Sequence, residues 1–388
     1  MTTSRAAVTE APGRIRVHEF EVPAAGPGAV VIKVSLSGIC GTDKHTFRGE
    51  SKQYAGTAHE RDIEYPLICG HENVGVVVDV GGEVRDSDGR VLAPGDRVVP
   101  GANVPCGRCY YCVNSFPYYF CEHLEDYGNS LNATRPPFLF GGWSEYMYLL
   151  PGTPIFRVPD ELPDELAVLT EVMAVTHGIE TANAILALQG NPAIGRTVAV
   201  LGVGPLGLCH LAKARLIGAG TIVATDRFAS RLELARELGA DVTLNVSEAS
   251  AEERRDAVLG LTRGRGADVV VDCSGVPETF TESLRLVRTG GVVVEAGTFV
   301  DMGGVSINPN SDICTRNVAV LGVGGETASS YAPAMALMAA NQGRYPLAKI
   351  VSHRFSLDEA EEAVQVAQRD EAMQVVFEPA LVRNGGSR

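Results

Sequence analysis

The sequence has little positive charge and no long apolar run. Its 33 lysines and arginines are outnumbered by 47 aspartates and glutamates, so the formal net charge is −14. Binding to nucleic-acid phosphates needs a basic surface, and we therefore expect no nucleic-acid partner. The longest apolar runs, such as residues 74–78 and 292–294, are far too short to cross a membrane. Residues 1–20 have no apolar h-region, so we expect neither a secretory signal nor a membrane protein.

Cysteine is present in an odd number. The chain has 9 cysteines and, on this interpretation, no signal peptide. In a reducing compartment cysteines bind metals or stay free, whereas those of secreted proteins usually pair. We therefore expect a cytoplasmic protein. Four cysteines outside the motifs described below are interpreted as core thiols: Cys69, Cys209, Cys273 and Cys314.

Length and hydrophobic pattern predict two domains of different kinds. A chain of 388 residues is long enough for two domains with full cores. The first part alternates as strands do, for example at residues 14–18 and 29–34, with a turn at 23–28 between them. After residue 163 a helical stretch at 165–187 is followed by short apolar strands that alternate with helices. This alternation predicts an α/β fold with a doubly wound parallel sheet.

A group of chemically active side chains follows one of the early strands. Cys40, Thr42, Asp43 and His45 lie close together in the sequence, and His71 follows in a second short motif. Thiolate and imidazole are ligands that zinc prefers. We predict that Cys40 and His71 bind a catalytic metal. The alternatives are that Cys40 is a buried apolar thiol and that His71 is a histidine of the core.

Four further cysteines have the spacing of a structural zinc site. Three follow the pattern C-x2-C-x2-C, and the fourth comes after eight intervening residues: Cys106, Cys109, Cys112 and Cys121. Four thiolates around one Zn²⁺ form a closed tetrahedral site that stabilises a loop with little core of its own. The alternatives are a redox-active pair or incidental cysteines. Aromatic residues between 110 and 120 either pack this lobe onto its neighbours, which we prefer, or contact a partner subunit.

A glycine motif in the second half has the context of a dinucleotide site. Gly202, Gly204 and Gly207 follow a predicted strand and open a helix, and Asp226 stands 19 positions after the last glycine. The first glycine permits a tight turn, the second lets the backbone approach a pyrophosphate, and the third lets helix and strand pack closely. Asp226 would bind the adenosine ribose hydroxyls and repel a 2′-phosphate. The alternative is a glycine-rich turn without a ligand.

The predicted cofactor is therefore NAD rather than NADP. The helix that begins after Gly204 presents free N–H groups and the positive end of its dipole to the phosphates. Pro205 and Leu206 stand at this helix start and are counted among the cofactor contacts. Arg227 and Arg231 stand close to Asp226 in the sequence and could soften the preference for NAD.

Together these motifs resemble the zinc-dependent medium-chain dehydrogenase/reductase family, in particular its alcohol and polyol dehydrogenases. The resemblance is carried by the segments 38–43, 70–75, 95–98 and 142–146, by the four-cysteine lobe and by the glycine motif. It implies a GroES-like β-rich catalytic domain of residues 1–170 and 325–388, and a Rossmann NAD-binding domain of residues 171–324. One catalytic and one structural zinc ion per chain are expected.

The resemblance also implies roles for individual residues. Thr42 matches the hydroxyl that takes the substrate proton, and His45 the imidazole that passes it on. Glu171 is the candidate for the third ligand of the catalytic zinc, and Glu72 is expected close to the metal, sometimes reaching it. Asp43 would orient His71. Arg231 matches a basic position that contacts the adenosine ribose.

The expected function is hydride transfer between NAD and a secondary alcohol, a cyclic alcohol or a polyol. The alternatives are a primary alcohol or aldehyde dehydrogenase of the same fold, and a binding protein that has lost turnover. The loops at 47–66, which include Tyr54, His59, Arg61 and Asp62, and at 129–140 look long for the family and could shape the substrate site. A homodimer or homotetramer is expected, with strand 318–321 near the sheet edge where two subunits could pair.

Overall fold

A computed structural model describes residues 2–50, 52–53, 56, 60–190, 194–369 and 372–381. The chain forms two compact units. Unit 1 comprises residues 1–171, 327–340 and 351–388, and unit 2 comprises residues 172–326 and 341–350. Tyr54 and His59 lie outside the described residues.

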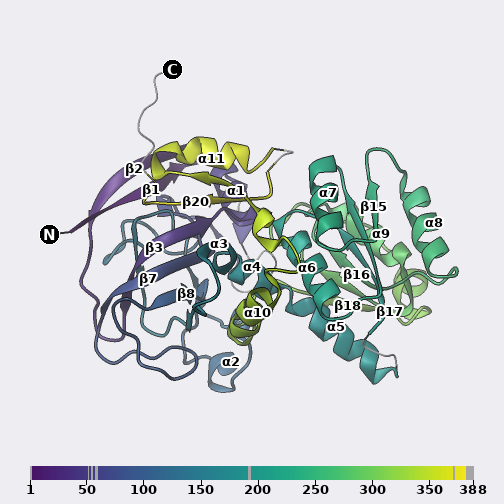
Figure 1. The fold of residues 1–388 in the computed structure, drawn as a ribbon, viewed down its shortest axis with the longest axis horizontal. Coiled ribbons are helices and arrows are strands. Elements are labelled where there is room, and N and C mark those ends of the chain that lie inside the picture. The colour runs from purple at the N-terminus through teal and green to yellow at the C-terminus, as the bar shows by residue number, and fades with distance from the viewer. Residues whose placement is uncertain are drawn as a thin grey trace. The chain divides into compact units, whose positions relative to one another are not determined.

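Unit 1 is built on a mixed sheet of seven strands (Figure 1). Its order is β12-β8-β7-β3-β20-β19, and β11 also pairs with β3. Its strands are β3 (Val30–Gly38), β7 (Asn73–Val80), β8 (Arg97–Pro100), β11 (Tyr146–Leu149), β12 (Ile155–Arg157), β19 (Val351–Phe355) and β20 (Gln374–Phe377). β3 lies inside this sheet, with β7 and β20 as its neighbours, and its apolar residues Val30, Val31, Ile32 and Val34 belong to one buried cluster.

A second sheet in unit 1 corrects one detail of the sequence interpretation. Its order is β2-β1-β6, with bounds β1 (Thr3–Ala11), β2 (Arg14–Glu21) and β6 (Leu67–Ile68). The expected strands at 14–18 and 29–34 both exist, but the first pairs with β1, which the sequence interpretation did not include, and the second belongs to the other sheet. Two-stranded pairs complete the β structure of unit 1: β4 (Lys52–Gln53) with β5 (Arg61–Asp62), and β9 (Asn103–Val104) with β10 (Glu125–Asp126).

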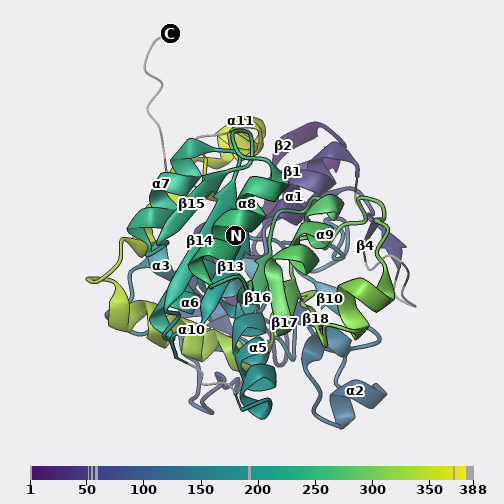
Figure 2. The same ribbon diagram turned by 90° about the vertical axis from the view of Figure 1, so that its right-hand side faces the viewer.

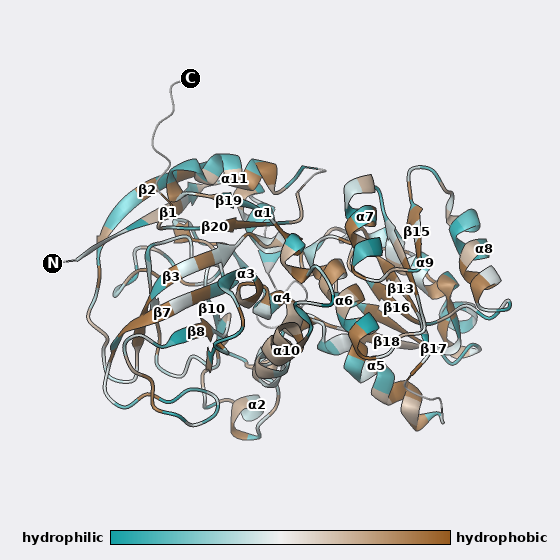
Figure 3. Cartoon of the chain, viewed as in Figure 1, coloured by the Kyte–Doolittle hydropathy of each residue, from teal (hydrophilic) through white to brown (hydrophobic). Residues whose placement is uncertain are grey.

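Unit 2 contains the predicted parallel sheet. Its six strands have the order β15-β14-β13-β16-β17-β18, and every neighbouring pair is parallel (Figure 2). The strands are predominantly apolar (Figure 3) because both faces of such a sheet are covered by helices. Their bounds are β13 (Thr197–Leu201), β14 (Thr221–Asp226), β15 (Val242–Asn245), β16 (Ala267–Asp272), β17 (Val287–Glu295) and β18 (Ala319–Gly322).

The helices of unit 2 alternate with its strands, beginning with one that precedes β13. They are α5 (His177–Leu188), α6 (Pro205–Leu216), α7 (Ala229–Glu237), α8 (Ala251–Leu261) and α9 (Pro277–Leu286), with a π-helical turn at Pro309–Cys314 and a 3₁₀ turn at Leu347–Ile350. α6 packs on β13 and β14, and α9 packs on β16 and β17. The doubly wound α/β class is thereby confirmed.

The remaining helices belong to unit 1 or cross its boundary. They are α1 (Gly41–Arg48), α2 (Tyr110–Val113), α3 (Asp164–Ala167), α4 (Thr170–Val175), α10 (Ala328–Asn341) and α11 (Ala360–Val366), with 3₁₀ turns at Tyr118–Phe120 and Leu357–Glu359. The stretch 165–187 is not one helix. The hydroxyls of Thr170 and Thr176 each donate at 2.6 Å to the carbonyl three residues earlier, which competes with the regular helical ladder.

Across the described ranges, none of the helices is both long enough and apolar enough to cross a membrane.

Candidate active site and cofactor site

Three metal-ligating side chains meet beside the central strand of unit 1. The ligand atoms of Cys40, His71 and Glu72 all lie within 4.8 Å of one another. Cys40 follows β3 and is the N-cap residue of α1, and Glu72 precedes β7. β3 and β7 are neighbours in the sheet, and the Gly38 N–H donates to the Glu72 carbonyl at 2.8 Å. The antiparallel pairing therefore brings the two short motifs together.

Asp43 connects the two segments that carry these side chains. Its carboxylate is fully buried and accepts hydrogen bonds from the Cys40 N–H at 2.8 Å and the Gly70 N–H at 3.3 Å. His71 Nδ1 lies 4.0 Å from the same carboxylate. Asp43 thus fixes the backbone on either side of the site and faces the imidazole.

The electrostatics of this group suit a cation. Burial raises the pKa of the Cys40 thiol, and the nearby Asp43 raises it further. Burial also raises the pKa of Glu72 well above its usual range, and Cys40 adds to the effect. Two groups that could be anions, the partly buried Cys40 and the buried Glu72, thus lie close together, at a high electrostatic cost unless a positive charge joins them. A sulfur, a nitrogen and an oxygen donor in mutual reach form a set that zinc accepts.

Glu171 is not part of this close group. It is a buried residue in α4, within unit 1, and the three ligand atoms described above do not include it. Glu72, which the sequence analysis expected close to the metal and sometimes reaching it, is the carboxylate that lies in direct reach of Cys40 and His71. Ligation by Glu171 stays a prediction.

Thr42 and His45 both lie on α1. The hydroxyl oxygen of Thr42 is buried and, within the described residues, makes no hydrogen bond. Thr42 acts to lower the pKa of the Cys40 thiol, in opposition to burial, which raises it. The ring of His45 is partly exposed, and its Nδ1 lies 3.1 Å from Glu50 Oε2 and 3.0 Å from Arg48 Nη2. Burial and the Arg48 charge lower the pKa of His45, while Glu50 raises it. His45 is consequently neutral at pH 7 and able to accept a proton.

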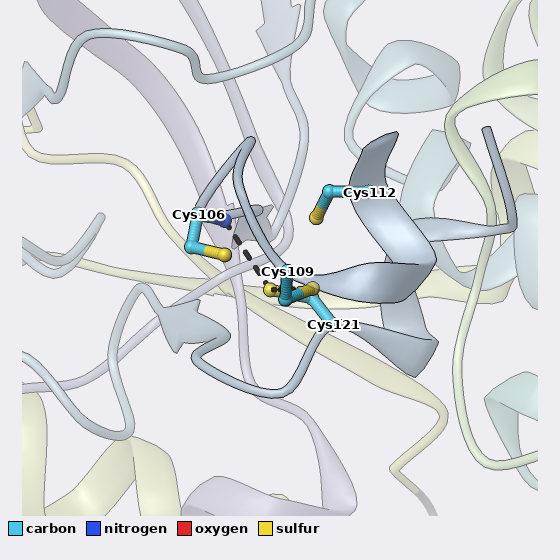
Figure 4. A group of neighbouring side chains, drawn as sticks. All are labelled: Cys106, Cys109, Cys112 and Cys121. Carbon is cyan, nitrogen blue, oxygen red and sulfur yellow. Dashed lines mark hydrogen bonds between the residues drawn. The ribbon is translucent and has the colours of Figure 1, made fainter. Parts of the chain in front are cut away.

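The four cysteines of the lobe converge as their spacing predicts. The sulfurs of Cys106, Cys109, Cys112 and Cys121 lie within 4.8 Å of one another (Figure 4). The Cys106 N–H donates to Cys121 Sγ at 3.2 Å, and the sulfurs of Cys109 and Cys121 are 3.9 Å apart. Burial acts to raise the pKa of Cys109, but hydrogen bonds from backbone N–H groups and neighbouring thiols lower it to about 6. The arrangement fits four-thiolate zinc ligation.

The aromatic residues of this lobe do not all pack inwards. Tyr118 is buried in a cluster with Cys109 and Cys121. Tyr110, Phe116 and Phe120 are instead 62%, 45% and 45% exposed. The preferred interpretation of the aromatic run as internal packing is therefore wrong for these three rings, which stack mainly on one another and on neighbouring lobe tyrosines.

The glycine motif in unit 2 has the predicted shape. Gly202 begins the turn after β13 with φ of +80°, a conformation that favours glycine. A Cβ on Gly207 would lie 1.9 Å from the Gly202 carbonyl oxygen, so only glycine fits where α6 crosses this turn. Gly204 is the N-cap of α6, followed by Pro205 and Leu206, and the space beside it is open except for Arg231 Nη1 at 3.6 Å.

Asp226 ends β14 and faces the glycine turn. Its carboxylate accepts from the Val203 N–H at 2.9 Å and from the Phe228 N–H at 3.0 Å. Arg231 Nη1 lies 3.9 Å from the same carboxylate. The guanidinium groups of Arg227 and Arg231 lie over the Phe228 ring, 4.4 and 4.7 Å from its centre. A carboxylate and two arginines therefore meet beside the helix N-terminus where a dinucleotide would bind.

Sequence reasoning missed one residue of the metal site. Gln374 in β20 donates from Nε2 to Glu72 Oε2 at 2.5 Å. Nothing in its local sequence points to this contact, because it depends on the pairing of β20 with β3. The structure also shows contacts of the two long loops. In the loop at 47–66, Arg61 donates to the Leu124 carbonyl at 3.2 Å, and in the loop at 129–140, Leu131 and Leu139 are buried in unit 1.

Comparison with known proteins agrees with this geometry. The profile of the alcohol dehydrogenase GroES-like domain matches residues 26–160, and that of the zinc-binding dehydrogenase domain matches residues 205–340. The 5-exo-hydroxycamphor dehydrogenase of Pseudomonas putida is 31% identical over 386 residues, which are 98% of this chain and 100% of that protein.

Solved structures give the same result. An alcohol dehydrogenase of Thermotoga maritima is 30% identical with a TM-score of 0.88, over 97% of this chain and 100% of that one. A Sinorhizobium meliloti protein described as a zinc-binding dehydrogenase, solved with NADP bound, is 31% identical with a TM-score of 0.81, over 98% of this chain and 100% of that one.

The fold and the site thus define an alcohol dehydrogenase that uses zinc and a nicotinamide cofactor. The chain belongs to the zinc-dependent medium-chain dehydrogenase/reductase family, as the resemblance implied.

Proposed function

We propose that the protein oxidises a secondary alcohol, a cyclic alcohol or a polyol with NAD, or runs the reverse reduction. The observation that carries this proposal is the meeting of Cys40, which is partly buried, with the buried His71 and Glu72, in a chain that also holds a dinucleotide motif with an acidic residue. Relatives named for hydroxycamphor and alcohol substrates support the same range of substrates.

In this proposal Cys40 and His71 bind the catalytic zinc, with Glu171 or Glu72 as the third protein ligand. A bound zinc ion polarises the substrate oxygen and lowers the pKa of an alcohol towards neutrality. The chain supplies the donors, and Asp43 fixes the backbone that carries two of them. Cys106, Cys109, Cys112 and Cys121 hold a second zinc ion that stabilises the lobe.

Thr42 and His45 move the proton. Thr42 stands two residues after Cys40. Its hydroxyl would accept the proton of the alcohol and at the same time donate its own proton to the next group in the path. His45, neutral at pH 7 and partly open to solvent, would receive that proton on the same helix. Proton transfer by positioned groups of this kind contributes about 10²–10⁴-fold to a rate.

Asp226 is proposed to select NAD. Its carboxylate is held by two backbone N–H groups at the end of β14, where the adenosine ribose hydroxyls of a dinucleotide are bound in Rossmann folds. A fixed negative charge there repels a 2′-phosphate. Arg227 and Arg231 counter this repulsion in part, and the Sinorhizobium meliloti relative was solved with NADP bound.

Domain roles, location and assembly complete the proposal. Residues 1–170 and 325–388 form the catalytic domain, and residues 171–324 bind NAD.

The protein acts in the cytoplasm, where its nine cysteines, all free thiols in the structure, stay reduced. It acts on a small alcohol or ketone and forms a homodimer or homotetramer, with β18 at the sheet edge available for pairing between subunits.

The test is NADH formation by the zinc-loaded protein across primary, secondary, cyclic and polyhydroxy alcohols, with NADP⁺ in parallel. We expect turnover confined to one of the proposed classes, two zinc ions per chain, and a higher kcat/KM with NAD. Cys40→Ser should abolish turnover, whereas Cys314→Ser, at an exposed cysteine outside both groups, should not. Turnover of primary alcohols alone would favour the alternative enzyme, and no turnover with only one zinc ion would favour a binding protein.

A further inference from the structure

We propose that Gln374 is a positioning residue for the catalytic metal, and that its amide holds one oxygen of Glu72 so that only the other can reach the ion. The inference rests on the proposed function, because it concerns the same metal site. Gln374 is the first residue of β20 and stands 335 positions from Ile39 in the sequence.

The contact is buried and uses the donor group of Gln374 completely. Nε2 donates to Glu72 Oε2 at 2.5 Å and to the Ile39 carbonyl at 3.4 Å. Both Gln374 and Glu72 are 1% exposed, so water does not compete for these bonds. An amide nitrogen carries two hydrogens, and the two acceptors on either side account for both.

The pair leaves no room for a side chain at position 38. A Cβ on Gly38 would lie 1.9 Å from Glu72 Oε2 and 2.7 Å from Gln374 Nε2. Gly38 in β3 pairs with Val376 of β20. This register places Gln374, two residues before Val376, beside the segments that carry Cys40 and Glu72. The absence of a side chain at position 38 thus permits the approach of the amide to the carboxylate.

The chemistry of the partner explains what the contact does. A carboxylate can bind a metal through one oxygen or both, and a strong donor on Oε2 leaves the other oxygen for the ion. The amide is neutral, so it directs Glu72 without cancelling the negative charge that attracts a cation. An arginine or lysine in its place would compete with the metal for that charge. Partners of this kind change metal affinity by about 10–100-fold when they are removed.

The test compares metal binding in the wild-type protein and in Gln374→Met, which keeps the volume and loses the donor. We expect at least ~10-fold weaker retention of the catalytic zinc against a chelator. With cobalt in the catalytic site, the visible absorption should change, because the second oxygen of Glu72 becomes free to bind. Gln374→Glu, which cannot donate when ionised, should act in the same direction and serves if the methionine variant folds poorly.

Two controls separate positioning from a general loss of stability. Val376→Ala opens a cavity in the same buried strand and should lower the melting temperature without changing the cobalt spectrum. In a Glu72→Gln background, Gln374→Met should have little further effect, because the two residues act through one contact.

The outcomes of the test are distinct. A wild-type protein with only one zinc ion per chain would overturn the proposed function itself. A wild-type protein with two zinc ions, together with a Gln374→Met variant of unchanged affinity and spectrum, would overturn the role of Gln374 and leave the proposed function standing.

Discussion

Asp272 and Glu295 end two neighbouring parallel strands of unit 2 and stand opposite each other in register. Asp272 Oδ1 accepts from the N–H and hydroxyl of Ser274, and Glu295 Oε1 accepts from the Thr298 hydroxyl at 2.8 Å. Within the described ranges the second oxygen of each carboxyl group is buried without a hydrogen-bond partner. Burial, and then the charge of Glu295, raise the pKa of Asp272 to about 7.

Asp272→Asn should therefore stabilise the protein above pH 7. The pKa of Asp272 is about 7 in the folded state and 3.8 in the unfolded state. Between pH 3.8 and pH 7 the folded chain therefore binds more protons than the unfolded chain, and the wild type loses stability as pH rises through this range. The loss is at most roughly 4 kcal/mol, and asparagine avoids it while keeping the oxygen that Ser274 needs.

Urea unfolding of the wild-type and variant proteins from pH 4 to pH 8 checks this expectation. The difference in unfolding free energy should grow up to about pH 7 and then stay constant. Asp256→Asn, at an exposed position of α8, is the control and should follow the wild type. A difference that does not vary with pH would contradict the elevated pKa.

The pH dependence of turnover should respond in opposite directions to two changes around His45. Arg48→Gln removes a charge that lowers the pKa of His45, and Glu50→Gln removes a group that raises it. If neutral His45 accepts the proton, the acid limb of kcat/KM moves to higher pH in the first variant and to lower pH in the second. Identical acid limbs in both variants would remove His45 from the proton path.

Replacing one cysteine of the four-cysteine lobe should remove the zinc ion of the lobe without changing the affinity for NAD. Cys121→Ser removes one of four thiolates, and we expect zinc content to fall from two ions to one per chain, with a lower melting temperature. NAD affinity, measured by quenching or enhancement of NADH fluorescence, should stay unchanged, because the glycine motif lies in unit 2. Retention of two zinc ions by this variant would show that the lobe does not bind the second metal.

Cofactor preference should shift when Asp226 is replaced. Asp226→Ser removes the charge at the end of β14 and leaves Arg227 and Arg231 in place. Hydrogen bonds to a charged group contribute about 1.5–3 kcal/mol, so kcat/KM with NAD should fall roughly 10–100-fold. The value with NADP should rise in the same preparation. Equal losses with both cofactors would indicate damage to the glycine turn instead of a change in selectivity.

The fold class, the convergence of the four cysteines and the shape of the glycine turn could be predicted from the sequence, for a physical reason. Parallel strands buried on both faces appear in the sequence as uninterrupted apolar runs, and a dinucleotide-binding turn appears as glycines at a fixed spacing. The fold of unit 2 could therefore be predicted from short stretches of sequence. The convergence of four sulfurs follows from spacing within one loop. Such features need no knowledge of distant parts of the chain.

Features that depend on distant pairing could not be predicted in this way. β1 pairs with the neighbouring β2 across a short turn, so its omission was an oversight of a local hairpin; only its pairing with β6 joins residues far apart in sequence. Gln374 was missed because a buried glutamine at the start of a short strand has no motif. Cys314 was interpreted as a core thiol, yet it is exposed at the end of a π-helical turn. Burial of a single thiol depends on packing that a local pattern does not record.

The pairing of β20 with β3 also has a consequence for synthesis on the ribosome. Gly38 and Cys40 emerge early, whereas Val376 and Gln374 follow only after every strand of unit 2 has been made. Unit 2 therefore holds all its strands while the sheet of unit 1 still lacks β19 and β20. During that interval Glu72 has no Gln374 amide beside it, so the proposed metal site is complete only after β20 has paired with β3.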